Sequence, residues 1–174
     1  DGNFPTCPYP NPEIKEALAL GLDLMKKTGA DLLLATDPDA DRVGIAVKEN
    51  DEYVLLTGNQ VGILLTDYIA KTRKELGTLP ENPIMVKSIV SSSLADAVAA
   101  SHGVETINVL TGFKYIGTEI KKLEEKGEEE RYILGFEESY GYLSGGYVRD
   151  KDAVVASMLI CEMTAYYKSQ GKSL

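Results

Sequence analysis

The chain of 174 residues is long enough for one domain or slightly more, because domains commonly contain about 100–150 residues. Its hydrophobic content of 44% is typical of a globular protein with a buried core and argues against a disordered chain. The formal net charge of −9 argues against a nucleic-acid partner, which would require a basic surface. A phosphorylated small substrate is not excluded, because a few local cations or a metal ion can offset the charge.

The start of the chain, "DGNFPTCPYPNPE", has neither the basic nor the apolar region of a signal peptide. No stretch reaches the roughly 18 apolar residues of a membrane span, so we expect no membrane partner and a cytoplasmic location. The missing initiator methionine predicts a piece of a longer protein.

Cys7 and Cys161 lack metal-ligand spacing. Reduced thiols are the favoured interpretation, and one disulfide is the alternative.

Residues 1–57 predict one helix and three strands. Pro12 can begin the helix and Gly29 can end it, with apolar residues at helical spacing between them. The strands are predicted at 32–35, 43–47 and 53–56, with a turn at Asn50-Asp51. This is too little for an independent α/β domain, so we interpret 1–57 as the C-terminal part of one.

From Gly58 onward, helices and strands alternate. Helices are predicted at 60–75, 94–102, 113–126 and 152–168, and strands at 84–87, 106–109 and 132–136. Ser91, Ser92 and Ser93 are predicted to cap the helix that follows them. The alternation predicts an α/β fold, with a mixed sheet flanked by helices, and a domain spanning 58–174.

The segment "ATDPDADR" places Asp37, Asp39 and Asp41 at every other position, followed by Arg42. Two carboxylates about 4 Å apart repel each other by about 1 kcal/mol in water and about 4 kcal/mol at an effective dielectric near 20. A divalent cation such as Mg²⁺, which prefers oxygen ligands, would offset this repulsion. In an extended strand Asp37 and Asp41 would lie roughly 13 Å apart. The backbone must therefore curl if the three carboxylates are to share one ion. A solvated acidic turn is the alternative.

An EF-hand is the competing metal motif, and the sequence does not fit it. The sixth position of such a loop requires Gly and here is Arg42, and the twelfth requires Glu and here is Lys48. The guanidinium of Arg42 instead suits a neighbouring carboxylate or an anionic substrate group.

Four motifs in order resemble the α-D-phosphohexomutases, the family of phosphoglucomutases and phosphomannomutases. "TDPDADRVG" is similar to their metal-binding loop, and "DGNFPTCPYPNPE" to the segment that precedes it by a helix. "TGFKYIG" resembles the loop that orients the sugar ring, and "GFEESYG" resembles the sugar-binding loop. The match is nearest to the branch of bacterial phosphoglucomutases and phosphopentomutase-like enzymes. It implies one complete domain of this family, the third, after the C-terminal part of the second.

The resemblance implies a transfer of phosphate between the C1 and C6 (or C5) oxygens of a sugar, through a phosphoserine and a bisphosphate intermediate. Asp37, Asp39 and Asp41 match the metal ligands, with the phosphoserine phosphate as a further ligand. Arg42 matches a position beside the reacting phosphate. Glu137 and Ser139 match residues that hold sugar hydroxyls. On extended backbone, side chains at i and i+2 face the same way, which suits adjacent hydroxyls.

The resemblance implies three further site residues in the loop that orients the sugar and one in a strand. Thr111, Gly112 and Lys114 belong to the loop that orients the sugar, although Lys114 is also compatible with a plain surface role. Lys87 matches a lysine proposed to handle the proton of the attacking hydroxyl. A solvated lysine at a strand end is the alternative for Lys87.

Nothing in the sequence fits the family's T-x-S-H-N-P-type serine loop or its C-terminal R-x-S-G-T-type phosphate loop. The resemblance therefore implies that domains 1 and 4 of the parent chain are partners of this segment, and that the segment alone is inactive. A glucose 1,6-bisphosphate-type activator is implied for the parent enzyme. Two alternatives remain open: a D-x-D-type sugar phosphatase, with Asp37 as nucleophile and Asp39 as acid, and a metal- or sugar-binding module without catalysis.

Overall fold

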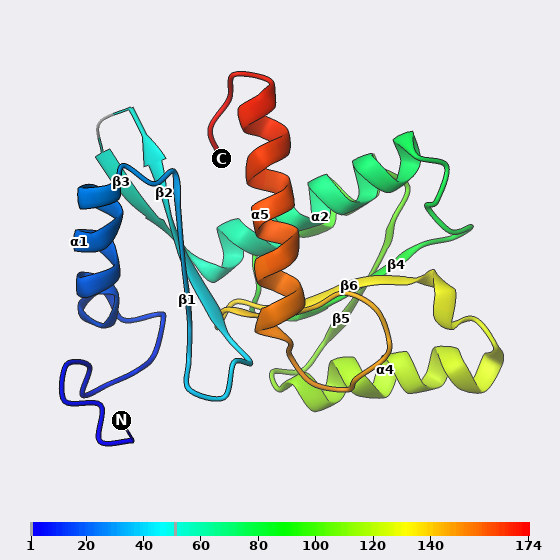
Figure 1. The fold of residues 1–174 in the computed structure, drawn as a ribbon. Helices are drawn as coiled ribbons and strands as arrows, with labels where there is room; N and C mark the ends of the chain where they lie inside the picture. Colours follow the sequence, from blue (N-terminus) through cyan, green and yellow to red (C-terminus); the bar gives the residue numbers. More distant parts are fainter. Residues whose placement is uncertain (1, 51) are drawn as a thin grey trace.

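The computed structural model describes residues 2–50 and 52–174, which form an α/β structure with two β-sheets side by side (Figure 1). The elements in chain order are a 3₁₀ helix η1 (Lys15–Leu18), α1 (Ala19–Thr28), β1 (Leu32–Thr36), β2 (Val43–Glu49), β3 (Glu52–Leu56), α2 (Gly58–Glu75), β4 (Ile84–Ser88), α3 (Leu94–Ser101), β5 (Glu105–Val109), α4 (Phe113–Lys126), a 3₁₀ helix η2 (Glu129–Arg131), β6 (Tyr132–Glu137), β7 (Gly141–Leu143) and α5 (Ala153–Ser169).

The first sheet is antiparallel, in the order β1-β2-β3. Its central strand β2 is buried from Val43 to Val47, as expected for a strand that is covered on both faces. Helix α1 packs on β1, and α5 packs on both β1 and β2 (Figure 1). Helix α5 also contacts β7 and α2, so it connects this sheet to the second one.

The second sheet has the order β5-β4-β6-β7, with β4 parallel to both neighbours and β7 antiparallel to β6. Alternate residues of β4 face opposite sides. Ile84 and Val86 pack with α4, whereas Met85 packs with the core of α2, α3 and α5. Figure 1 shows α4 on one side of this sheet. The mixed sheet flanked by helices is therefore as predicted.

The carboxyl ends of the three parallel strands meet at one edge of the second sheet. Strands β4, β5 and β6 end at Ser88, Val109 and Glu137. The loops that follow them carry the predicted sugar-site residues, as is usual for parallel α/β sheets.

Backbone contacts join the first sheet to this same edge. The N–H of Val43 donates to the carbonyl of Tyr140 over 3.1 Å, and Arg42 forms a single antiparallel bridge with Gly141. The N–H of Ala153, at the start of α5, donates to the carbonyl of Ala40 over 3.0 Å. The aspartate loop between β1 and β2 is thereby held beside the turn between β6 and β7.

Two segments differ from the sequence prediction. The helix predicted to begin at Pro12 starts later, as η1 and then α1, because Pro12 packs on β2. A Cβ atom at Gly44 would lie 2.6 Å from the carbonyl oxygen of Pro12, so the two backbones are in close contact. Strand β7 was not predicted from the sequence, because its three residues are too few for an alternating pattern. Gly29 ends α1 in a left-handed conformation, as predicted.

The remaining predictions concern the cysteines, the membrane and one turn. Cys7 and Cys161 are both free thiols. No helix within 2–50 and 52–174 has the length and apolar character needed to cross a membrane. Of the turn predicted at Asn50-Asp51, Asn50 has a positive φ of 54°, and Asp51 lies outside the described residues.

Replacing Gly58 with Ala should destabilise the protein. A Cβ atom at this first residue of α2 would overlap the carbonyl oxygen of Glu138, so the helix or the turn must move. We expect a loss of about 1–3 kcal/mol in the free energy of unfolding, measured by urea denaturation, although Ala favours helices by up to about 1 kcal/mol. Gly2→Ala, which meets nothing within 4 Å, is the control and should change little. Equal stability of the two variants would contradict the close contact.

Candidate metal centre and sugar-binding turn

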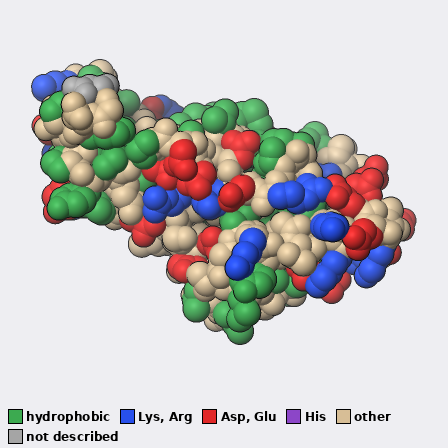
Figure 2. All heavy atoms as spheres, turned by 90° about the horizontal axis from the view of Figure 1, so that it is seen from below, with side chains coloured by type: hydrophobic (Ala, Val, Ile, Leu, Met, Phe, Trp, Pro, Cys, Tyr) green, Lys and Arg blue, Asp and Glu red, His purple; other side chains and the backbone are tan. Residues whose placement is uncertain are grey.

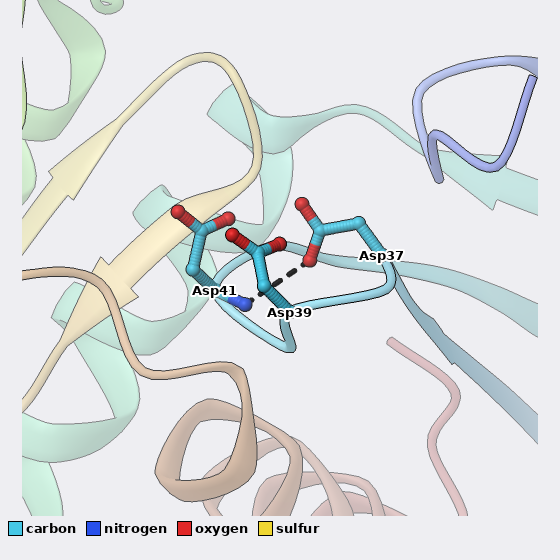
Figure 3. A group of neighbouring side chains, drawn as sticks. All are labelled: Asp37, Asp39 and Asp41. Carbon is cyan, nitrogen blue, oxygen red and sulfur yellow. Dashed lines mark hydrogen bonds between the residues drawn. The ribbon is translucent and has the colours of Figure 1, made fainter. Parts of the chain in front are cut away.

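The aspartate loop is curled, as the shared-cation hypothesis requires. Ala40 has a positive φ of 56°, and the carboxylate of Asp37 accepts through Oδ1 from the backbone N–H groups of Asp41 and Arg42, both at 3.0 Å. The curl brings one carboxylate oxygen each of Asp37, Asp39 and Asp41 to within 4.8 Å of one another. Figure 3 shows the three carboxylates gathered together along the loop. The separation is much shorter than the roughly 13 Å of an extended strand.

The chemistry of the donor set fits a hard divalent cation. Oxygen ligands at about 2.0–2.1 Å from Mg²⁺ are separated by about 3 Å when adjacent and about 4 Å when opposite. The spacing of 4.8 Å or less is near this range, so small side-chain movements suffice. Asp37 is buried, Asp41 is half-buried and Asp39 is exposed, so the group opens toward solvent. A cation can therefore be held from one side, with its other ligands supplied from outside the loop.

Two protein cations already contact the aspartates. Nε of Arg42 donates to Oδ2 of Asp37 over 2.7 Å, and Nζ of Lys151 lies 2.8 Å from Oδ2 of Asp41. Figure 2 shows acidic and basic side chains grouped next to one another on the lower face of the molecule. The loop is thus partly neutralised by residues of its own chain.

The pKa values of the two aspartates shift in opposite directions. Burial alone would raise the pKa of Asp37, but the hydrogen bonds from Arg42 lower it below its usual value. The pKa of Asp41 is raised, mainly by burial, although the ion pair with Lys151 acts against this shift. Of these two aspartates, Asp37 is therefore held more firmly in the ionised form, the form that binds a cation.

Lys151 was missed by the sequence prediction. It lies in the segment between β7 and α5, and its Nζ also contacts Asp150 over 3.0 Å and lies 5.6 Å from the centroid of the Phe113 ring. It is separated from Asp41 by more than 100 positions, so no local spacing pattern could link the two.

Glu137 and Gly112 meet, which joins the two predicted sugar loops. Glu137 is the last residue of β6 and is only 5% exposed. Its Oε1 accepts a hydrogen bond of 2.6 Å from the backbone N–H of Gly112, which precedes α4 and has a φ of 120°. The glycine allows this backbone conformation, which residues with a side chain rarely adopt.

Ser139 does not lie on extended backbone, so the geometric argument from alternating side chains is wrong here. The residue belongs to a tight turn of residues 138–140 that links β6 to β7, and the next residue, Tyr140, has a positive φ of 67°. The antiparallel pairing of Glu137 with Gly141 forces this reversal. Ser139 is half-buried within the turn.

The other predicted residues have contrasting environments. Thr111 and Lys114 are exposed, and Nζ of Lys114 lies 5.1 Å from the centroid of the Tyr115 ring. Lys87 is 2% exposed, so the solvated-lysine alternative is wrong. Its Nζ donates to the carbonyl of Ser91 over 3.3 Å and lies 3.4 Å from a carboxylate oxygen of Asp96 in α3.

The predicted serine cap of α3 is not formed, because the N-cap residue is Ser93 and its side chain makes no cap hydrogen bond. Oγ of Ser92 accepts from the N–H of Leu94 over 3.2 Å. The hydroxyl of Ser91 instead donates to Glu138 of the β6–β7 turn. This contact bridges segments 47 positions apart, so the local sequence could not reveal it.

Comparison with known proteins extends over the whole chain. A phosphoglucomutase from Staphylococcus aureus is 42% identical over 100% of this chain, and one from Staphylococcus epidermidis is 41% identical over the same share. The chain covers 30% and 31% of their lengths. The fold matches the crystal structure of a phosphoglucomutase/phosphomannomutase family protein from Burkholderia thailandensis, with a TM-score of 0.74 and 21% identity over 95% of this chain and 32% of that one.

Family models give the same assignment with residue ranges. Residues 1–50 match α/β/α domain II of phosphoglucomutase/phosphomannomutase, and residues 57–174 match α/β/α domain III. The chain belongs to the phosphoglucomutase/phosphomannomutase family.

Replacing Asp37 or Asp39 with Asn should separate the structural role from the ligand role. Both variants should bind Mn²⁺ or Mg²⁺ at least tenfold more weakly in calorimetry, because each loses a charged ligand. Asp37→Asn should also lose about 1–3 kcal/mol of stability, because the buried carboxylate accepts from Arg42 and from two backbone N–H groups. Asp39→Asn is the matched control. Because Asp39 is exposed, the stability of this variant should equal that of the wild type. Unaltered metal affinity in both variants would refute the metal site.

Proposed function

We propose that this chain supplies the metal-binding and sugar-binding parts of a phosphosugar mutase. The enzyme would move phosphate between the C1 and C6 (or C5) oxygens of a sugar through a phosphoserine and a bisphosphate intermediate. The observation that carries the proposal is the position of the curled aspartate loop, which is joined by backbone hydrogen bonds to the turn that carries Ser139. A cation site beside a hydroxyl-binding turn suits a substrate that carries both phosphate and sugar hydroxyls.

Asp37, Asp39 and Asp41 would hold Mg²⁺ together with the phosphate of a phosphoserine. When bound, the ion would neutralise charge on the oxygens of the transferring phosphoryl group. Arg42 keeps Asp37 ionised and oriented through its Nε, and we assign it a position beside the reacting phosphate. Its Nη1 also contacts Glu13 over 3.4 Å, and the remaining guanidinium donors suit phosphate oxygens.

Glu137 and Ser139 would hold the sugar hydroxyls, and Thr111, Gly112 and Lys114 would orient the ring. The hydrogen bond from Gly112 to Glu137 supports a joint role for the two loops. The exposed ammonium of Lys114 suits an anionic group of the substrate. We assign Lys87 to the proton of the attacking hydroxyl, and its burial beside Ser91 and Asp96 supports a defined position for its Nζ.

We further propose that residues 1–57 form the end of the second domain and residues 58–174 the third domain. The curated relatives are about three times as long as this chain, which supports a parent protein with further domains. Those domains would supply the serine that carries the phosphoryl group and a loop that binds the second phosphate. The segment alone would then be inactive, and its parent would act in cytoplasmic carbohydrate metabolism.

A glucose 1,6-bisphosphate-type activator completes the proposal. One solved structure of similar fold, an N-acetylphosphoglucosamine mutase variant from Aspergillus fumigatus, is a complex with glucose 1,6-bisphosphate. Its identity to this chain is 15%, with a TM-score of 0.55. Membership of the phosphoglucomutase/phosphomannomutase family favours the mutase over the D-x-D-type phosphatase and over a module without catalysis.

A coupled assay of glucose 1-phosphate conversion to glucose 6-phosphate tests this function. The full-length gene product, with Mg²⁺ and glucose 1,6-bisphosphate, should be active, and the 174-residue segment should be silent. In the full-length protein, Asp39→Asn should lower kcat at least 100-fold without unfolding, because an exposed metal ligand is lost. Turnover by the segment alone would overturn the assignment of roles, and release of inorganic phosphate instead of isomerisation would favour the phosphatase.

A further inference from the structure

The turn between β6 and β7 is anchored by a residue outside the proposed metal and sugar contacts. Oε2 of Glu138 accepts hydrogen bonds from Oγ of Ser88 over 2.6 Å and from Oγ of Ser91 over 3.2 Å. The two hydroxyls are themselves 2.7 Å apart, and both serines are buried. Hydrogen bonds to an ionised acceptor are about twice as strong as neutral ones, so this cluster holds the carboxylate in one orientation.

The backbone of the same turn is held from two other directions. The carbonyl of Tyr140 accepts from the N–H of Val43, which follows the aspartate loop. The backbone of Glu138 packs directly on Gly58, at the start of α2. The loop that carries Ser91 is also tied to α2, because Oδ1 of Asn59 accepts from the N–H of Ser92 over 2.8 Å. The serines therefore form a rigid support for the side chain of Glu138.

Neighbouring side chains of the turn are anchored to different elements. Glu137 reaches the N–H of Gly112 at the start of α4, whereas Glu138 reaches the serines at the end of β4. Ser139 follows Glu138 directly, so its position depends on the hydrogen bonds of both glutamates. The Glu138 side chain is therefore the contact that ties the turn to the loop after β4, in addition to the backbone contacts with Val43 and Gly58.

We propose that Glu138 is a positioning residue of the sugar site, which orients Ser139 and Glu137 through Ser88 and Ser91. The inference rests on the proposed function, because it concerns the groups assigned to sugar hydroxyls. The proposal assigns Glu138 no contact with the sugar, because its Oε2 accepts from two buried serine hydroxyls. Geometry matters strongly in such sites, since a misplacement of about 1 Å can cost on the order of 100-fold in rate.

The test uses the full-length gene product with Glu138→Ala, Glu138→Gln, Ser88→Ala and the double variant Glu138→Ala/Ser88→Ala. Glu130→Gln is the matched control, because Glu130 is an exposed glutamate outside the site. Three quantities are measured: the affinity for glucose 6-phosphate by calorimetry, the affinity for Mg²⁺, and hydrogen exchange of the peptide covering residues 134–142. Kinetic constants are added where turnover is present.

We expect Glu138→Ala to weaken glucose 6-phosphate binding and to raise KM by about tenfold or more, with faster exchange in the turn. Mg²⁺ affinity should stay within about twofold, because the backbone bond from Val43 still holds the aspartate loop. Ser88→Ala should give a similar but smaller effect, and the double variant should be no worse than Glu138→Ala, because both remove the same interaction. Glu138→Gln keeps an oxygen acceptor and should restore most of the affinity.

Two binding results in Glu138→Ala would overturn the inference. One is an unchanged glucose 6-phosphate affinity in Glu138→Ala, whether or not hydrogen exchange rises, because Glu138 would then act on stability alone. The other is an equal loss of Mg²⁺ and sugar binding, which would indicate general loosening.

The outcomes separate this inference from the proposed function. A wild-type protein that lacks mutase activity but shows Glu138-dependent sugar binding would refute only the function. An active wild type with normal KM in Glu138→Ala would refute only the inference. A wild type that binds no sugar phosphate would overturn both.

Discussion

The backbone pairing of residues 42–43 with residues 140–141 is the contact on which the proposed site depends. It joins the second strand of the antiparallel sheet to the last hairpin of the mixed sheet through the hydrogen bond from Val43 to Tyr140 and the bridge from Arg42 to Gly141. Helix α5 and the hydrogen bond from Ala153 to Ala40 also connect the two sheets, and this pairing adds the direct backbone contact between the aspartate loop and the β6–β7 turn. A reaction on a phosphorylated sugar needs both groups at a set distance.

The second constraint is the concentration of negative charge in the aspartate loop. Three carboxylates within 4.8 Å repel one another, and the chain offsets part of this repulsion with Arg42 from the loop itself and Lys151 from the segment before α5. Backbone N–H groups directed at Asp37 contribute further. The chain therefore offsets part of the negative charge of the loop by itself, and a bound cation would offset more of it.

Most secondary structure could be predicted because its signals are local. Gly29 ends α1, and the predicted boundaries of β4 and α4 agree with the structure to within one residue. The failures lie where packing overrides local preference. Pro12 favours a helix start but is held against Gly44, and β7 is stabilised by pairing with β6 rather than by its own residues. The arrangement of Glu137 and Ser139 was misjudged for the same reason, because that pairing turns the backbone.

The sequence by itself determined the class of fold, the family resemblance and the oxygen-donor chemistry of the candidate metal site. These follow from periodicity, from motifs in a fixed order and from oxygen donors at close spacing. Only the tertiary structure decided which distant residues meet: Lys151 with Asp41, Gly112 with Glu137, and Ser88 with Glu138. The physical reason is that these contacts join residues 25 to more than 100 positions apart, and their distances are set by how strands and helices pack rather than by neighbours in the chain.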